Sequence, residues 1–297
     1  MIRRNDFLKI AGASAVSTAL TPTFAANSGE PSRKRICIFT KPFQHMSYRE
    51  LAETVADIGA DGLEFPLRPK GHIEPQKAAD ELPKLVEALD KCQLKVDILA
   101  SGIQDITSPH VESILKTAKS LGITKYRMSY FRYDLKKSIP DQLNEIKPKL
   151  KDLVAMNKDL GVQALYQNHS GSKYVGAPLW DVFQLFEPHD PKYLALAFDI
   201  GHATVEGGKS WPVQYQLLKP HIQAIYVKEA LWKNKTLSWT SLGEGQVDKR
   251  FFKTIQKDQL PGPLSLHVEY ISHKDPKNLP IFIQAFKKDL KTLKSWL

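Results

Sequence analysis

The feature that most constrains the fold is a regular alternation of short apolar runs with longer amphipathic segments. After residue 35, each apolar run reads as a buried strand and is followed by a segment of helical periodicity. Strands that alternate with helices form parallel sheets, and eight such units close into a barrel. The sequence therefore predicts an α/β protein, a single (β/α)8 TIM barrel over residues 36–297. The expected strands are Ile36–Thr40, Gly62–Phe65, Leu94–Ala100, Lys125–Tyr130, Gln163–Gln167, Leu194–Ile200, Ile222–Lys228 and Leu264–Tyr270.

Helix signals separate these strands. Ser47 is a plausible N-cap, and Glu50 three residues later completes a capping box. Glycines such as Gly122 and Gly161 follow the last periodic residue of their segments, as helix stops do. The expected helices cover about 47–58, 75–91, 109–121, 140–160, 178–186, a segment starting near 210, 248–257 and 279–296.

Residues 1–26 have the order of an export signal. Arg3 and Arg4 precede Phe7, a weakly apolar run rich in small residues follows, and Ala25 lies at a small-residue cleavage site. The run is too short to span a membrane. The arginine pair is similar to a twin-arginine signal, but two residues instead of one separate it from Phe7, so Sec export and an uncleaved segment stay open. We expect an exported, periplasmic protein in which residues 27–35 form a linker.

Charge and cysteine content narrow the function classes. The formal net charge is +10, but the excess lies on helix faces such as Lys147–Lys151 and Lys287–Lys294. Solvated faces explain this better than a nucleic-acid groove, although a basic surface also suits anionic glycans. Only Cys37 and Cys92 are present, too few for a disulfide framework, and both read as packing residues. We predict no membrane span in the mature protein and leave an oligomer open.

Two neighbouring strands end abruptly in polar side chains. Such groups are costly at the end of a buried strand unless they are paired or used. In (β/α)8 barrels the carboxyl ends of the strands hold the active site. The alternative is that these groups only cap strands or bind loop backbone. They are Gln167, Asn168 and His169 after the fifth strand and Asp199 and His202 after the sixth.

Other strand ends add charged groups to the same expected mouth. They are Lys41, Glu64, Lys228 with Glu229, and Glu269. A carboxylate, an imidazole and a second carboxylate suit a divalent ion such as Mn, Mg or Zn. Asp199 and His202, three residues apart, can point to one place, although the same spacing also occurs in an ordinary capped turn.

Several motifs together resemble the xylose-isomerase-like barrel superfamily, often labelled sugar phosphate isomerase/epimerase, which includes endonuclease IV relatives. They are FDIGHA, the LGEG turn at Leu242–Gly245 and LHVEY in the eighth strand. QNHSG, HATVEGGKSWP and YVKE-x-x-W resemble an exported branch of that group. The resemblance covers nearly all of the chain after the linker.

The resemblance implies a metal site in which Glu, Asp, His and Glu from strands five to eight bind the ion. Asp199 and Glu269 match, whereas Gln167 replaces the first Glu and Tyr226 replaces the His. His202 corresponds to a substrate-contacting His and could become a ligand. We therefore predict Asp199, Glu269, His202 and Gln167 as ligands of a divalent metal, bound more weakly than by four standard ligands.

The remaining roles follow from position at the mouth. We predict Glu269, Lys228, His169 and Glu64 as catalytic groups, although Lys228 could pair with Glu229 or Glu64 in a purely structural role. The predicted substrate contacts are Lys41, Gln167, Asn168, His202, Trp211 and Trp232. The two tryptophans follow the sixth and seventh strands, where aromatic rings suit sugar faces, and loop packing is the alternative reading.

Three functions remain. The first is an exported isomerase, epimerase or lyase that abstracts a proton next to a carbonyl of a sugar or keto-sugar, with a metal stabilising the enediolate. The second is a non-catalytic carbohydrate-binding barrel that has lost its metal, which the changes at Gln167 and Tyr226 favour. The third, phosphodiester cleavage, needs a richer multi-zinc ligand set than these strand ends supply. The expected partner in the first two cases is a small-molecule carbohydrate.

Overall fold

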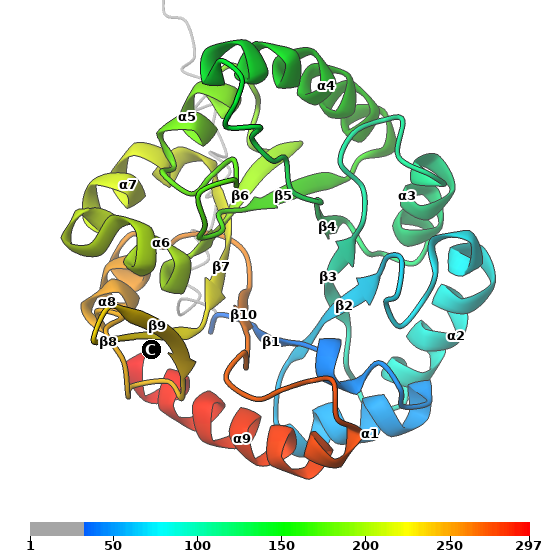
Figure 1. Ribbon diagram of the computed structural model, residues 1–297. Helices are drawn as coiled ribbons and strands as arrows, with labels where there is room; N and C mark the ends of the chain where they lie inside the picture. Colours follow the sequence, from blue (N-terminus) through cyan, green and yellow to red (C-terminus); the bar gives the residue numbers. More distant parts are fainter. Residues whose placement is uncertain (1–32) are drawn as a thin grey trace, which may run out of the picture. The chain divides into compact units, whose positions relative to one another are not determined.

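The computed structural model describes residues 33–297, and these residues form a closed barrel of parallel strands (Figure 1). Around the barrel the order is β1-β10-β7-β6-β5-β4-β3-β2, so each strand lies beside its neighbour in the chain of strand–helix units. The predicted (β/α)8 barrel is confirmed. The barrel strands are β1 Ile36–Phe39, β2 Gly62–Leu67, β3 Val96–Ser101, β4 Lys125–Arg127, β5 Gln163–Gln167, β6 Leu194–Asp199, β7 Ile222–Val227 and β10 Leu264–Leu266.

Helices surround the barrel, as Figure 1 shows. The capping box predicted at Ser47 and Glu50 is present at the start of α1. The helices are α1 Tyr48–Ile58, α2 Ala78–Asp90, α3 Val111–Ser120, α4 Ile139–Leu160, α5 Trp180–Phe186, α6 Ile200–Gly207, α7 Trp211–Leu218, α8 Arg250–Lys257 and α9 Leu279–Trp296, with short 3-10 turns η1 Lys41–Phe43, η2 Pro75–Lys77, η3 Gly208–Ser210, η4 Lys219–His221 and η5 Pro276–Asn278. None of these helices is long and apolar enough to cross a membrane.

Apolar residues pack in two places. The larger core lies between the strands and the helices, and it contains the buried faces of all the long helices. A smaller cluster fills the inside of the barrel, and it consists of Ile98, Leu165, Ala195, Ala197, Ala224 and Tyr226. Because small alanines line much of this interior, space remains there for the charged side chains described below.

Three departures from the predicted elements affect the site. Helix α6 begins at Ile200, where the sequence predicted the end of a strand and no helix before about residue 210. An antiparallel hairpin, β8 Glu229–Lys233 with β9 Thr236–Thr240, follows β7 where the sequence suggested only a loop. The last strand ends at Leu266 instead of Tyr270, because β10 pairs with β1 and β7 over three residues each. Glu269 therefore lies on a segment beyond the strand.

The predicted export signal at residues 1–26, and most of the predicted linker, lie outside the described residues. The last linker residues belong to the barrel unit, which begins at Lys34. Arg35, directly before β1, pairs with Asp97 of β3, with 2.8 Å between Nε and Oδ1. The barrel unit therefore begins slightly before the predicted domain boundary.

Candidate functional site

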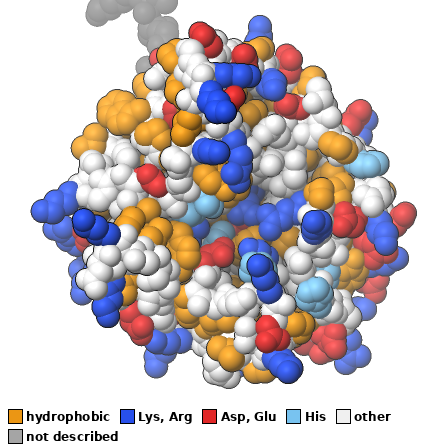
Figure 2. All heavy atoms as spheres, in the orientation of Figure 1, with side chains coloured by type: hydrophobic (Ala, Val, Ile, Leu, Met, Phe, Trp, Pro, Cys, Tyr) orange, Lys and Arg blue, Asp and Glu red, His pale blue; other side chains and the backbone are white. Residues whose placement is uncertain are grey.

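Charged and histidine side chains gather at the carboxyl ends of the strands. Figure 2 looks into this end of the barrel and shows a hollow at the centre, with Lys and Arg, Asp and Glu, and His side chains around it. The side chains come from the ends of β5, β6 and β7 and from the segment after β10. We call this region the mouth.

The centre of the site is a buried ion pair. Lys228 Nζ lies 2.9 Å from Asp199 Oδ2, and both side chains are almost fully shielded from solvent. The same carboxylate oxygen accepts a hydrogen bond of 2.7 Å from Gln167 Nε2. Asp199 also caps α6, since Oδ1 accepts from the backbone N–H of His202. The capped turn is therefore present and lies at the mouth, whereas a functional role for Asp199 and His202 stays a prediction.

A glycine makes this ion pair possible. A Cβ at Gly201 would lie 2.7 Å from Lys228 Cγ and 2.8 Å from the Lys228 carbonyl oxygen. Those distances are too short for a real side chain, so the FDIGHA turn needs glycine here for β7 to approach α6. The motif thus encodes the contact between Asp199 and Lys228.

Gln167 joins the ion pair to a second buried cation. Its Oε1 accepts from Arg127 Nη1 at 2.8 Å and from the Tyr130 hydroxyl at 2.5 Å. Both polar atoms of the Gln167 amide are therefore occupied when its bond to Asp199 is included. Arg127 in turn lies 3.2 Å from Glu64 Oε1. Gln167 acts as a link between β4 and β6 within the site.

Two histidines lie against each other at the mouth, with ring centroids 4.0 Å apart. Burial, followed by the positive charge of Lys228, lowers the pKa of His169 to about 4 and also lowers the pKa of His202. Both rings are therefore neutral at pH 7. His202 Nδ1 contacts Ser170 Oγ at 2.8 Å, whereas its buried Nε2 has no hydrogen-bond partner among the described residues. That nitrogen is available to a bound ligand.

Glu269 supplies a carboxylate that solvent can still reach, with 28% of its side chain exposed. Burial alone would raise the pKa of Glu269, but nearby Lys228, His267 and Lys41 outweigh it and lower the pKa. Glu269 is therefore ionised at neutral pH. His267 Nδ1 lies 4.0 Å from its Oε1.

Glu64 lies below the mouth, inside the barrel. Its side chain is fully buried, and Oε2 receives hydrogen bonds from Ser265 Oγ at 2.6 Å and from His267 Nε2 at 2.8 Å. The predicted position of Glu64 at a strand end is wrong, and its catalytic role stays a prediction. The strand continues to Leu67, so Glu64 faces the barrel interior and supports Arg127 and His267 from beneath.

Three predicted substrate contacts either lie away from the mouth or already bond to other parts of the protein. Asn168 bonds both backbone groups of Asp199, through Nδ2 at 3.0 Å and Oδ1 at 2.7 Å, and so joins strand ends. Trp211 packs edge-on against Phe251 between α7 and α8. Trp232 is 41% exposed on the hairpin. The packing alternative therefore describes Trp211, whereas Trp232 is an exposed side chain of the hairpin and its predicted sugar contact stays a prediction.

The structure adds residues that sequence reasoning passed over. Trp239 on β9 lies under the Lys228 ammonium, 5.0 Å from Nζ to the ring centroid, and 5.1 Å from the His202 ring. His267 and Arg68 also belong to the site. His267 stands two residues before Glu269, and that spacing was the available signal. Trp239 gave none, because the hairpin was not expected.

The donor set does not fit a divalent metal as the side chains lie. Among residues 33–297 no three His, Cys, Asp or Glu side chains converge at metal-ligand spacing. His202 Nε2 and Asp199 Oδ2 are 3.9 Å apart, but the Asp199 oxygen already holds the Lys228 ammonium. Gln167 Oε1 already accepts hydrogen bonds from the Arg127 guanidinium and the Tyr130 hydroxyl. Metal ligation by Asp199, Glu269, His202 and Gln167 stays a prediction.

Comparison with known proteins places the fold. Residues 52–295 match the family model described as xylose isomerase-like TIM barrel. A 3-keto-D-glucoside 4-epimerase from E. coli is 16% identical with a TM-score of 0.66. The match covers 89% of this chain and 100% of the epimerase chain. A D-psicose 3-epimerase from Clostridium cellulolyticum, solved with D-tagatose, is 11% identical with a TM-score of 0.67. The match covers 89% of this chain and 99% of the epimerase chain. The search of curated proteins gave no match.

Proposed function

Because the chain belongs to the xylose isomerase-like TIM barrel family, we propose that it is a sugar-modifying enzyme that removes a proton next to a carbonyl of a sugar or keto-sugar. The observation that carries this proposal is the Lys228 ammonium, held at the mouth by Asp199 and close enough to Glu269 to lower the pKa of that carboxyl. A base and a fixed positive charge at one site are what such a reaction requires.

The first chemical step follows from these groups. The ionised Glu269 carboxylate takes the proton from the carbon next to the carbonyl, and the electron pair of that C–H bond moves onto the carbonyl oxygen. Lys228 stabilises the resulting enediolate oxygen, because a preorganised charge in a buried site needs no reorganisation. For isomerisation, the proton of the adjacent hydroxyl moves to the enediolate oxygen and the abstracted proton returns to the former carbonyl carbon. Return of a proton to the original carbon from the opposite face gives epimerisation, and departure of a β-hydroxyl as hydroxide, which takes up a proton to leave as water, gives elimination.

Other residues of the mouth position the substrate. The unpartnered His202 Nε2 can bond a sugar hydroxyl, and His169, neutral at pH 7, can do the same. Trp239 offers a ring face beside Lys228 for the apolar side of a sugar. Lys228 thus occupies the part of the site in which a metal was predicted, and no step of this reaction is assigned to a metal.

Deuterium exchange tests the proposal directly. A panel of neutral ketoses, aldoses and sugar acids is incubated with the protein in D2O, and NMR follows exchange at the carbon next to the carbonyl. We expect exchange with at least one sugar, and Glu269→Gln should reduce it by about 100-fold or more. Glu87→Gln, on the exposed outer face of α2, is the matched control and should leave it unchanged.

A carbohydrate-binding barrel without activity is the second candidate. The replacement of a carboxylate by Gln167, whose polar atoms are all bonded within the site, favours it. Saturable sugar binding without exchange by any member of the panel would select this candidate and reject the enzyme.

Export remains part of the proposal. The order of residues 1–26, a basic start before a weakly apolar run, supports delivery to the periplasm. Fractionation of cells that carry a fusion of this segment to a reporter tests it. Retention of Met1 on protein from the native host would contradict cleavage.

A further inference from the structure

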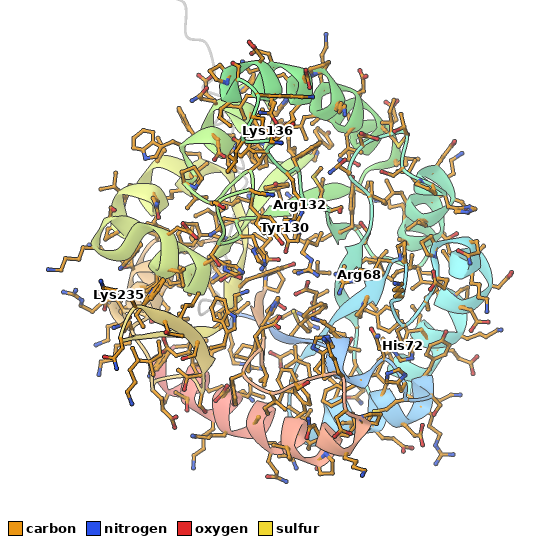
Figure 3. All side chains as sticks on the ribbon, in the orientation of Figure 1. Arg68, His72, Tyr130, Arg132, Lys136 and Lys235 are labelled. Carbon is orange, nitrogen blue, oxygen red and sulfur yellow. The ribbon has the colours of Figure 1, made fainter. Side chains whose placement is uncertain are left out.

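Two cations at the mouth have no partner within the described chain. Arg68 directly follows β2, and Lys41 begins η1 after β1. Neither side chain makes a hydrogen bond or ion pair with any residue of 33–297, although Arg127 and Lys228 beside them are both paired. Figure 3 labels Arg68 beside the barrel axis, on the side of β2. Both side chains are only partly exposed.

Keeping these two charges together is unfavourable for the protein on its own. Burial and then Arg127 lower the pKa of Arg68, while burial lowers the pKa of Lys41 even though Glu269 opposes the change. A positive charge that loses solvation without gaining a partner destabilises the folded chain. Such an arrangement is expected where a ligand brings the missing negative charge.

The charge balance of the mouth identifies that ligand as an anion. Glu64 neutralises Arg127 and Asp199 neutralises Lys228, so Glu269 is the one carboxylate of this cluster left to face two cations. The four Lys and Arg side chains of this cluster therefore exceed its three carboxylates by one positive charge. We propose, on the basis of the proposed function, that the substrate is an acidic carbohydrate whose carboxylate binds Arg68 and Lys41.

The shape of the cation site favours a carboxylate. One face of the Arg68 guanidinium is covered by Phe39, with Cζ 5.6 Å from the ring centroid. The N–H groups on the edge of the guanidinium are therefore free to donate to a ligand. A planar carboxylate suits them, because a guanidinium binds a carboxylate through two parallel hydrogen bonds. The excess of one positive charge also matches a monoanion.

A phosphate fits the mouth less well. TIM barrels commonly bind phosphate through loops after the seventh and eighth strands. Here the Glu229 carboxylate accepts from the backbone N–H groups of that region, from Ala230 at 3.1 Å, Gly243 at 3.1 Å and Val247 at 2.8 Å. Those donors are therefore taken by the protein itself.

The test observes Arg68 itself. Nitrogen-15 NMR follows its Nε–Hε signal, assigned by its loss in Arg68→Gln, while D-galacturonate, D-glucuronate or D-gluconate is added at constant ionic strength. We expect at least one of these acids to shift the signal saturably, and D-galactose and D-glucose at the same concentrations to leave it in place. Arg68→Gln should weaken that binding, measured by calorimetry, by at least about tenfold. Lys235→Gln, exposed on the hairpin (Figure 3), is the matched control and should bind normally.

Three results would overturn the inference. These are an equal shift with the neutral sugars, no saturable shift with any of the acids, and a shift with D-glucose 6-phosphate alone, which would assign the site to phosphate. Failure of the proposed function is distinguishable. If an acid binds through Arg68 but no deuterium exchange occurs, the proposed enzyme activity is rejected and the binding of an acid at Arg68 stands. If neutral sugars exchange and Arg68→Gln leaves that exchange unchanged, the enzyme activity stands and the inference is rejected.

Discussion

At the scale of single residues, the site is organised by one buried ammonium. Lys228 has a carboxylate of Asp199 on one side and the ring of Trp239 on the other. Its remaining N–H groups have no other hydrogen-bond acceptor within residues 33–297 and are free to bind a substrate oxygen. A charge in this position is not interchangeable with a polar group, because it compensates a buried carboxylate as well.

Removing that ammonium should destabilise the fold. Lys228→Met leaves the Asp199 carboxylate buried with only the N–H groups of Gln167 and His202, and breaking a buried pair costs about 3 kcal/mol of unfolding free energy. Urea denaturation measures the loss. Lys287→Met removes the exposed partner of Asp57 and should cost less than about 1 kcal/mol.

The double variant Lys228→Met, Asp199→Asn sharpens this test. Because it removes both charges, it should recover part of the stability lost in the single variant. A single variant as stable as the wild type would show that Asp199 does not depend on Lys228.

At the scale of elements, two connections after neighbouring strands build the site. The turn from β6 into α6 caps the helix with Asp199 and keeps Gly201 against β7. The hairpin of β8 and β9 brings Trp239 over the mouth, while Glu229 at its base bonds the backbone of the LGEG turn. Both connections follow strands, where (β/α)8 barrels place their functional groups.

Gly201→Ala should damage both the site and the fold. The new methyl group would meet the backbone oxygen and the Cγ of Lys228, so β7 and α6 must separate, at a cost of about 1–3 kcal/mol. We expect deuterium exchange to fall together with the thermal midpoint. Gly207→Ala on the same helix is the matched control, because its methyl group meets only the movable end of Gln214. Equal effects of the two substitutions would argue against a special role for the FDIGHA turn.

Trp239→Ala should weaken sugar binding by about tenfold without unfolding the barrel. The indole covers Lys228 and His202, and a cation over an aromatic ring contributes about 0.5–2 kcal/mol. Calorimetry with a sugar from the exchange panel measures the change. Trp232→Ala, at an exposed position of the same hairpin, should bind as the wild type does. Loss of binding in both variants would point to the hairpin as a whole.

At the scale of the whole molecule, the neutral histidines make stability depend on pH. Burial holds the pKa of His169 at about 4 and that of His202 below its ordinary value of 6.5. Between about pH 4 and 6.5 the unfolded chain therefore binds more protons than the folded chain, so acidification favours unfolding.

The thermal midpoint should fall as pH decreases from 7 to 5. Each of these histidines contributes up to about 1.4 kcal/mol of unfolding free energy per pH unit within that window. His169→Gln should make the dependence shallower, and His110→Gln, on the surface before α3, should leave it as it is. A wild-type midpoint that does not change between pH 7 and 5 would contradict the assignment of buried neutral imidazoles.

Local sequence patterns were sufficient to predict the barrel and the neighbourhood of its site. Apolar periodicity and helix caps depend on residues close together in the chain, so the eight barrel strands, most helices and the Ser47 capping box could be predicted. Helix α6 and the hairpin of β8 and β9 were not predicted. Strand ends share one face of any such barrel, and this rule alone predicts that Gln167, His169, Asp199 and Lys228 lie near one another.

The contacts of each polar group, in contrast, depend on how distant parts of the chain meet. Glu64 bonds Ser265, a residue 201 positions away, because the barrel closes β1 between β2 and β10. Such a contact depends on strand register and on side-chain direction across the closed sheet, which local patterns do not contain. For the same reason the sequence did not reveal that Asn168 binds backbone, that Trp239 covers Lys228, or that Arg68 and Lys41 stay unpaired within the described chain.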